Sequence, residues 1–81
     1  MTGDSGGNSN GDQVTGLDAF DIPYSKQVVL QEVAYESGMT LLRVRIKEGS
    51  RFTIVELDPD SAARWGKTLT QWAAAHAPQQ P

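Results

Sequence analysis

The sequence predicts an α+β domain in which a three-stranded antiparallel β-meander packs against one C-terminal α-helix. Runs rich in β-branched and aromatic residues occupy 27–36, 39–48 and 51–57, which is typical of strands. Ser-Gly and Gly-Ser pairs separate the runs and are suited to tight turns. An Asp-Pro pair then opens a segment with apolar residues at helical spacing. We therefore expect a β-β-β-α domain over residues 27–77.

Two segments precede this domain. Residues 1–16 hold five glycines and only two apolar residues, Met1 and Val14, so we expect a disordered acidic tail. Residues 17–26 are predicted to form an irregular apolar arm, because Pro23 excludes a helix. Four apolar side chains belong to this arm: Leu17, Phe20, Ile22 and Tyr24.

The two turns, each taken as two residues long, predict a register. Gly49-Ser50 would pair Glu48 with Arg51, as a type II′ turn that begins with glycine. Ser37-Gly38 would pair Tyr35 with Thr40. One face then collects Val29, Val33, Tyr35, Leu42, Val44, Ile46, Val55 and Leu57. The other face aligns Glu32, Arg43 and Glu56 in a row of opposite charges, and a slip of one residue would destroy both patterns.

The helix is expected to begin after Asp58, a good N-cap residue, with Pro59 at the first helical position. An apolar stripe follows at helical spacing: Ala62, Trp65, Leu69, Trp72, Ala73 and His76. A helix of about 18 residues spans roughly 27 Å, close to the length of an eight-residue strand. We therefore predict that the stripe covers the apolar sheet face, and that residues 78–81 fray.

Composition limits the classes of function. The chain has 81 residues, which suits one small domain, and it contains no cysteine. Its net charge of −3 comes from residues 1–26, because acids and bases balance in 27–81; this disfavours a nucleic-acid partner. No signal-like N-terminus and no apolar run of about 20 residues is visible. We expect a cytoplasmic protein without membrane contact.

The second sheet face of this register is predicted to be an interaction surface. It mixes apolar and basic side chains: Val28, Leu30, Leu41, Arg43, Arg45, Lys47, Phe52 and Ile54. Exposed apolar patches of this kind mark binding sites, and so small a core favours association. We expect a homodimer, or a protein partner, through this face or an edge strand. Either the arm or a second chain would cover the patch.

Three patterns that suggest chemistry have simpler interpretations. "RWGKT" at 64–68 ends like a phosphate-binding loop, but Ser61 stands where the first glycine belongs and the segment is helical in character. "NSNGD" at 8–12 lacks the acidic residues of a calcium loop at 6 and 17. His76 is the single histidine and has no evident partner for metal or catalysis. We predict no cofactor, metal or small-molecule ligand.

Glu32 and Glu56 are the remaining catalytic candidates. In the predicted register Arg43 lies between them, which would keep both ionised and would not separate their pKa values. A structural salt-bridge row is the better interpretation, so we predict that the protein is not an enzyme. An enzyme subunit completed by a partner chain stays open as an alternative.

A second alternative is a small nucleic-acid-binding regulator. Arg43, Arg45 and Lys47 form a basic row, and Phe52 lies near it. Basic side chains beside an aromatic ring suit the phosphates and bases of a single strand. The flanking glutamates favour a solvated or salt-bridged strand face, so an interaction or accessory module remains the preferred function.

From Phe52 to Ala75 the segment "FTIVELDPDSAARWGKTLTQWAAA" resembles a pattern in small uncharacterised bacterial proteins. These proteins end in a hairpin strand, an Asp-Pro or Ser-Pro cap and a helix rich in Ala and Leu. The resemblance covers about a third of the chain and implies a small bacterial domain of unknown function. It implies no catalytic residues.

Gly66 lies in the middle of the predicted helix, where glycine costs about 1 kcal/mol relative to alanine. Its presence suggests a close approach of the helix to the sheet or to a partner helix. We expect Gly66→Ala to disrupt packing if the approach is close, and to stabilise the chain if the site is open.

Overall fold

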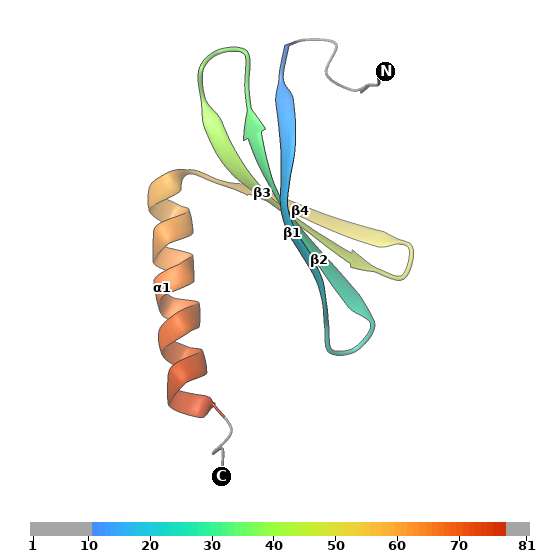
Figure 1. Ribbon diagram of the computed structural model, residues 1–81. Helices are drawn as coiled ribbons and strands as arrows, with labels where there is room; N and C mark the ends of the chain where they lie inside the picture. The colour runs from blue at the N-terminus through green and yellow to red at the C-terminus, as the bar shows by residue number, and fades with distance from the viewer. Residues whose placement is uncertain (1–10, 78–81) are drawn as a thin grey trace.

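A computed structural model describes residues 11–77. Four antiparallel strands form one sheet in the order β1-β2-β3-β4, and one helix follows (Figure 1). The elements are β1 Gln13–Ile22, β2 Lys26–Ala34, β3 Thr40–Glu48, β4 Arg51–Leu57 and α1 Pro59–His76. The α+β class, the meander and the C-terminal helix are confirmed, but the sheet has four strands and the prediction had three. Predictions for residues 1–10 and 78–81 lie outside the described residues.

The additional strand is β1, so the irregular arm predicted at 17–26 is wrong. Most of the arm lies in β1, which also takes in residues 13–16 of the predicted tail. β1 pairs along its length with β2, with a bulge at Leu17 between Gly16 and Asp18. Two aspartates, a glycine and the bulge obscure any two-residue alternation, so pairing with β2 and not local propensity makes this segment a strand.

The hairpin between β3 and β4 has the predicted register. Glu48 pairs with Arg51, Val44 with Val55, and Leu42 with Leu57. Gly49 has a φ of 62°, and Ser50 is not among the residues with positive φ. This is the pattern of the expected type II′ turn.

The register between β2 and β3 differs by one residue from the prediction. Ala34 pairs with Thr40, and the Tyr35 amide donates to the Met39 carbonyl at 2.8 Å. The loop therefore has three residues, with Gly38 at a φ of 101°. This is a turn followed by a left-handed residue, which glycine adopts without strain.

That shift turns every side chain of β2 to the other face. Val28 and Leu30 lie on the face predicted for Val29 and Val33, and Gln31 takes the predicted place of Glu32 beside Arg43. In the predicted row Glu32–Arg43–Glu56, the pairing of Arg43 with Glu56 is therefore correct and the pairing of Arg43 with Glu32 is wrong.

The core is small and lies on one side of the sheet, which we call the inner face. Its buried cluster is Val28, Val44 and Leu57. Around the cluster are partly buried apolar residues: Ile22, Leu30, Leu42, Ile46, Val55 and, from α1, Ala62. On the opposite side, the outer face, Val33 is buried to 1% exposure opposite Val14 and Leu41.

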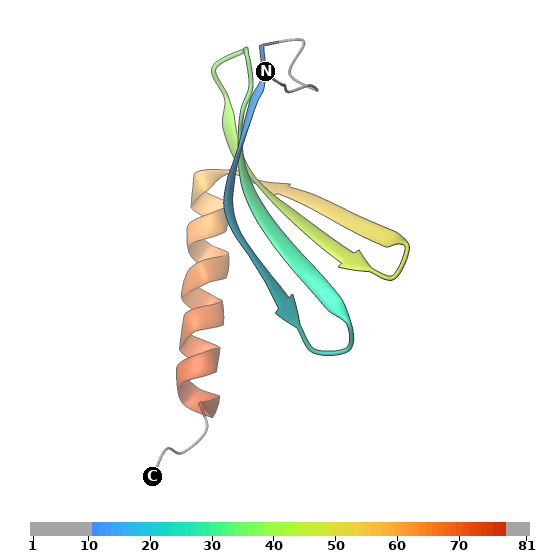
Figure 2. The ribbon, with the colours of Figure 1, turned by 45° about the vertical axis from the view of Figure 1, so that its right-hand side comes forward.

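The helix begins as predicted but does not lie along the sheet. Asp58 Oδ1 accepts a hydrogen bond from the Ser61 amide at 3.2 Å, and Pro59 opens the helix. No residue of α1 is buried. Ala62 in the first turn packs at the inner face, and the rest of the helix continues beside the sheet (Figures 1 and 2).

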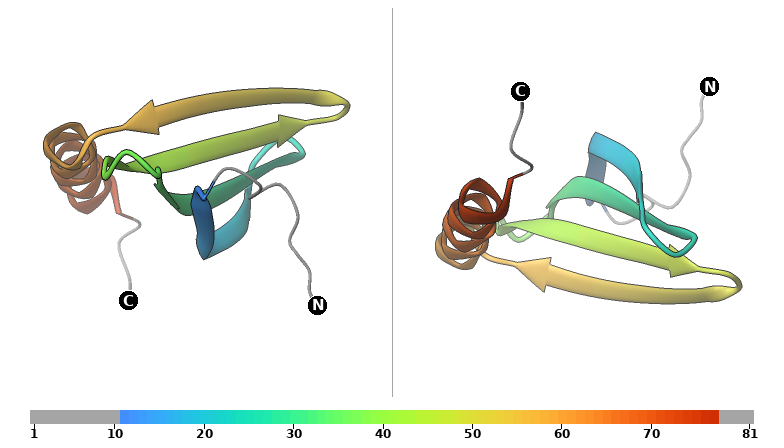
Figure 3. Two further views of the ribbon diagram at one scale, coloured as in Figure 1. Left: turned by 90° about the horizontal axis from the view of Figure 1, so that it is seen from above. Right: turned by 90° about the horizontal axis from the view of Figure 1, so that it is seen from below.

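The connection between β4 and α1 explains this placement. Leu57 ends β4 and Pro59 begins α1, so Asp58 is the whole connection, where strand-to-helix loops usually have 2–6 residues. With this one connecting residue, α1 leaves the end of β4 and does not return along the strand (Figure 1). Seen from above, α1 is nearly end-on at one end of the sheet (Figure 3). The radius of gyration is 15.6 Å, against about 12 Å for a compact chain of this length.

The space around Gly66 determines whether an alanine at this position stabilises or destabilises the chain. A Cβ at Gly66 would meet nothing within 4 Å, so Gly66→Ala should raise the unfolding free energy by up to about 1 kcal/mol. Gly38→Ala is the matched control, because it also has open space but a φ of 101°. It should destabilise by about 1–2 kcal/mol. Thermal melts measure both variants. A change of stability in the same direction for both would contradict the open environment of Gly66.

Candidate functional site

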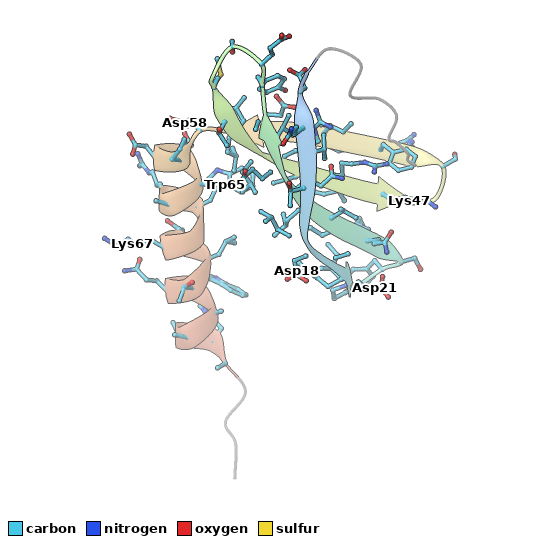
Figure 4. The ribbon with its side chains drawn as sticks, turned by 45° about the horizontal axis from the view of Figure 1, so that its top comes forward. Asp18, Asp21, Lys47, Asp58, Trp65 and Lys67 are labelled. Carbon is cyan, nitrogen blue, oxygen red and sulfur yellow. The ribbon has the colours of Figure 1, made fainter. Side chains whose placement is uncertain are left out.

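An exposed row of large apolar side chains lies on α1. Trp65, Leu69 and Trp72 follow one another at spacings of four and three, so they line one side of the helix; we call them the helix stripe. Their exposed fractions are 47%, 64% and 63%. Trp65 points toward the sheet, and Lys67 points away from it (Figure 4). The helix stripe therefore begins on the side of α1 that faces the sheet, and its three side chains remain about half exposed or more.

Two further side chains border the stripe. A hollow of about 510 Å³ beside Trp65 and Leu69 is also lined by Arg64, so this cation lies at the edge of the stripe. His76 continues the stripe at its C-terminal end and stacks on Trp72 with ring centroids 4.5 Å apart. Its Nδ1 lies 3.0 Å from the Trp72 carbonyl oxygen. His76 is thus in contact with the helix stripe through Trp72.

The predicted interaction surface divides between the two faces. Six of its eight residues share the outer face: Leu41, Arg43, Arg45, Lys47, Phe52 and Ile54. Val28 and Leu30 lie on the inner face, because of the one-residue shift of β2, and Val28 is buried in the core. Phe52 and Ile54 are 52% and 55% exposed.

Arg43 is engaged on the outer face and is not a free cation. Its Nε and Nη2 donate to Glu56 Oε2 at 3.0 and 2.9 Å. The Tyr35 hydroxyl donates to both oxygens of Glu56, at 2.7 and 2.8 Å. These donors, with the Tyr35 bond contributing most, lower the pKa of Glu56. A carboxylate held ionised in this way is a poor general base at neutral pH.

The Glu56 contacts predict a pH-dependent contribution to stability. The pKa of Glu56 is lower in the folded chain than its value of about 4.5 in the unfolded chain. The ionised carboxylate therefore stabilises the folded state above pH 4.5, and this stabilisation is lost as the pH falls through the folded-state pKa. Glu56→Gln should cost about 1 kcal/mol at pH 7 and much less at pH 3. Denaturant titrations at both pH values measure this difference.

Glu48→Gln is the control for this prediction. Glu48 forms an ion pair with Lys26 at 3.4 Å, and its side chain is 57% exposed. Glu48→Gln should therefore change the free energy of unfolding by close to zero at pH 7. A Glu56→Gln effect that persists unchanged at pH 3 would contradict the role of the ionised carboxylate.

Arg45 and Lys47 gather around Phe52 on the same face. The Arg45 guanidinium carbon is 5.0 Å and the Lys47 Nζ 5.9 Å from the centre of the ring. These are cation–π distances. Gln27 and Val29 of β2 line a shallow depression together with these three residues, with a volume of about 180 Å³. We call Arg45, Lys47 and Phe52 the basic cluster.

The remaining sequence motifs concern metal ions, nucleotides and membranes. Within residues 11–77, no three side chains of the His, Cys, Asp and Glu types come together as metal ligands. Gly66, Lys67 and Thr68 lie inside α1, where backbone amides donate within the helix. In the same part of the chain, no helix combines the length and the apolar character that crossing a membrane requires.

The predicted core included the helix stripe, but its three side chains lie on the surface. Their helical spacing was recognised, and covering them with the sheet was the natural interpretation of an amphipathic stripe. The signal against it is the single residue between the last strand residue and Pro59. Such a short connection leaves the stripe uncovered within the chain.

The fold and these surfaces define an α+β domain with a β-meander sheet and a C-terminal helix whose apolar stripe is exposed. The chain belongs to a family of unknown function, DUF6967, whose family model matches residues 11–75. The match begins just before β1 and ends one residue before the end of α1, so β1 belongs to the family's domain. No curated protein and no solved structure matches the chain.

Proposed function

We propose that the protein is a non-enzymatic interaction module of the bacterial cytoplasm that associates with itself and serves as an accessory to another protein. One observation carries the proposal: α1 displays two tryptophans and a leucine on one side, and buries none of its residues. Soluble monomers rarely leave such a patch open, and patches of this kind mark protein contacts. Tryptophan is also enriched among the residues that dominate binding energy.

The small core supports association further. Four apolar side chains are buried among the described residues: Val28, Val33, Val44 and Leu57. Domains with so little buried surface gain stability by oligomerisation. The inner face beside the helix stripe is also only partly covered. A partner that bound here would therefore also increase the apolar surface that the core buries.

Light scattering coupled to gel filtration tests self-association. We expect a mass of two chains at 10–100 µM, with dissociation on dilution. A single-chain mass at all concentrations, with the tryptophan fluorescence of solvent-exposed indoles, would refute self-association.

The alternative function is binding of single-stranded nucleic acid by the basic cluster. The specific observation is the placement of Arg45 and Lys47 over Phe52, which offers two cations and an aromatic face in one place. The engaged state of Arg43 weakens this alternative, because its charge is neutralised by Glu56.

A titration with mixed RNA and DNA oligonucleotides at low salt separates the two functions. Salt-sensitive binding that is lost in Arg45→Glu would support the nucleic-acid function. Arg51→Glu, on the same hairpin but outside the basic cluster, is the charge-matched control. No binding by the wild type would exclude the alternative.

A further inference from the structure

Each chain carries two apolar surfaces that do not cover each other. The helix stripe, Trp65, Leu69 and Trp72, is about half exposed or more. On the inner face, partly buried side chains surround the core: Ile22, Leu30, Leu42, Ile46 and Val55. A stripe on a helix and an apolar sheet face are the two surfaces that pack together in α+β domains. They suit each other, but within one chain Ala62 is the residue of α1 that packs against the buried cluster, and the helix stripe stays about half exposed or more.

The connection between β4 and α1 holds the two surfaces apart. Asp58 is extended, with φ −76° and ψ 167°, and it caps the helix through its side chain. Its carbonyl also accepts the Ala62 amide at 2.9 Å. Folding α1 onto its own sheet would rotate this residue and break the cap, a loss of about 0.5–2 kcal/mol. A second copy can bring its inner face to the stripe without this loss.

The charges beside the two surfaces are complementary. Arg64 lies at the edge of the helix stripe, in the hollow that Trp65 and Leu69 also line. Asp18 and Glu32 lie on the inner face of β1 and β2, because they pair with Leu30 and Leu42. Neither acid forms an ion pair within residues 11–77. A helix from a second copy would bring its Arg64 toward these carboxylates.

The area is sufficient for a stable dimer when the contact occurs twice. An aromatic side chain buries about 150–250 Å², so the exposed parts of the two indoles contribute roughly 200 Å² per chain. With Leu69 and the inner face of the partner, one contact buries on the order of 400 Å² on each side. A symmetric dimer contains two such contacts and reaches the usual range of about 1,200–2,000 Å² in total.

We propose that two copies of the chain exchange their helices: α1 of each copy packs its helix stripe on the inner face of the other. This inference rests on the proposed self-association and specifies its geometry. The interface is isologous, so a twofold axis relates the two helices and the assembly closes at two chains. Trp65, Leu69 and Trp72 are the anchor residues, and the pair Arg64 and Glu32 sets the orientation.

Disulfide trapping between different chains tests the exchange, and the absence of native cysteine makes it clean. One chain carries Leu69→Cys, and a ¹⁵N-labelled chain carries Leu30→Cys. After mixing and mild oxidation, we expect a two-chain product in which mass spectrometry finds the mixed disulfide. Ile54→Cys is the matched control, because Ile54 is 55% exposed but lies on the outer face, and it should not form a disulfide with position 69. Should Leu30→Cys unfold the chain, Val55→Cys takes its place.

Two other disulfides would overturn the exchange. A chain with both Leu69→Cys and Leu30→Cys that closes within itself at low concentration would show that α1 covers its own sheet. A product joined through position 69 of both chains, with no mixed disulfide, would show that the helices pair with each other. A wild-type dimer without the mixed disulfide refutes the exchange alone, whereas a wild-type monomer refutes the proposed self-association.

Discussion

Leu69→Glu is expected to convert the self-associated protein into a monomer. Leu69 is the central residue of the helix stripe and is 64% exposed in the single chain, so the substitution leaves the fold of the chain intact. Glutamate and leucine also have similar helix propensities. In the proposed interface the carboxylate would lose its hydration against apolar side chains, at a cost of roughly 3 kcal/mol or more. The dissociation constant should therefore increase at least about a hundredfold.

Thr70→Glu is the matched control for this prediction. It introduces the same charge one position further along α1, about 100° around the helix from Leu69. Light scattering and sedimentation at 10–100 µM should show a dimer for Thr70→Glu and a monomer for Leu69→Glu, with the same helical circular dichroism. Equal dissociation of both variants would point to net charge as the cause and would contradict a role for the helix stripe.

Leu57→Ala should have the second large effect, on stability. Leu57 ends β4, is 8% exposed, and belongs to the buried cluster with Val28 and Val44. Removing a buried leucine side chain costs about 2–5 kcal/mol. A single core of this size supplies about 3–5 kcal/mol in total. We therefore expect Leu57→Ala to be largely unfolded at 37 °C.

Ile54→Ala is the control on the same strand. Ile54 lies on the outer face and is 55% exposed, so its truncation should cost less than about 1 kcal/mol. Denaturant unfolding followed by circular dichroism, at one fixed protein concentration because association shifts the apparent stability, measures both variants. Similar losses for the two variants would contradict the assignment of the inner face as the core.

Local chemistry made parts of this fold predictable. The hairpin between β3 and β4 follows from Gly49-Ser50, where glycine at the first turn position determines the turn type and thus the pairing. The helix start follows from Asp58 and Pro59, whose side chains suit the cap and the first turn. In both cases the deciding interaction joins residues that are close in the sequence.

The register of β2 could not be predicted in the same way. The segment Glu36-Ser37-Gly38 suits both a two-residue turn at 37–38 and a three-residue loop that ends in a left-handed glycine. The two loops differ by one residue, and that difference exchanges the faces of Val28 and Val29. Both versions of β2 place apolar residues on each side, so hydrophobic patterning alone does not separate them.

Strand β1 was missed for a related reason. Gly16, Asp18 and Asp21 are poor strand formers, and the bulge at Leu17 interrupts the alternation. An edge strand of this kind is held by its backbone bonds to β2, which a single sequence does not reveal. Its aspartates also protect the open edge from further pairing.

The sequence by itself determined the three strands from β2 to β4, the capped helix, the stripe of Trp65, Leu69 and Trp72, and the basic residues of β3. Only the tertiary structure decided that β1 completes the sheet, that β2 directs Val28 and Leu30 inward, and that the stripe remains uncovered. The physical reason is that propensity, capping and periodicity act within a few residues. Register and helix placement depend on a one-residue loop difference and a one-residue connection, whose consequences appear only when distant segments pack.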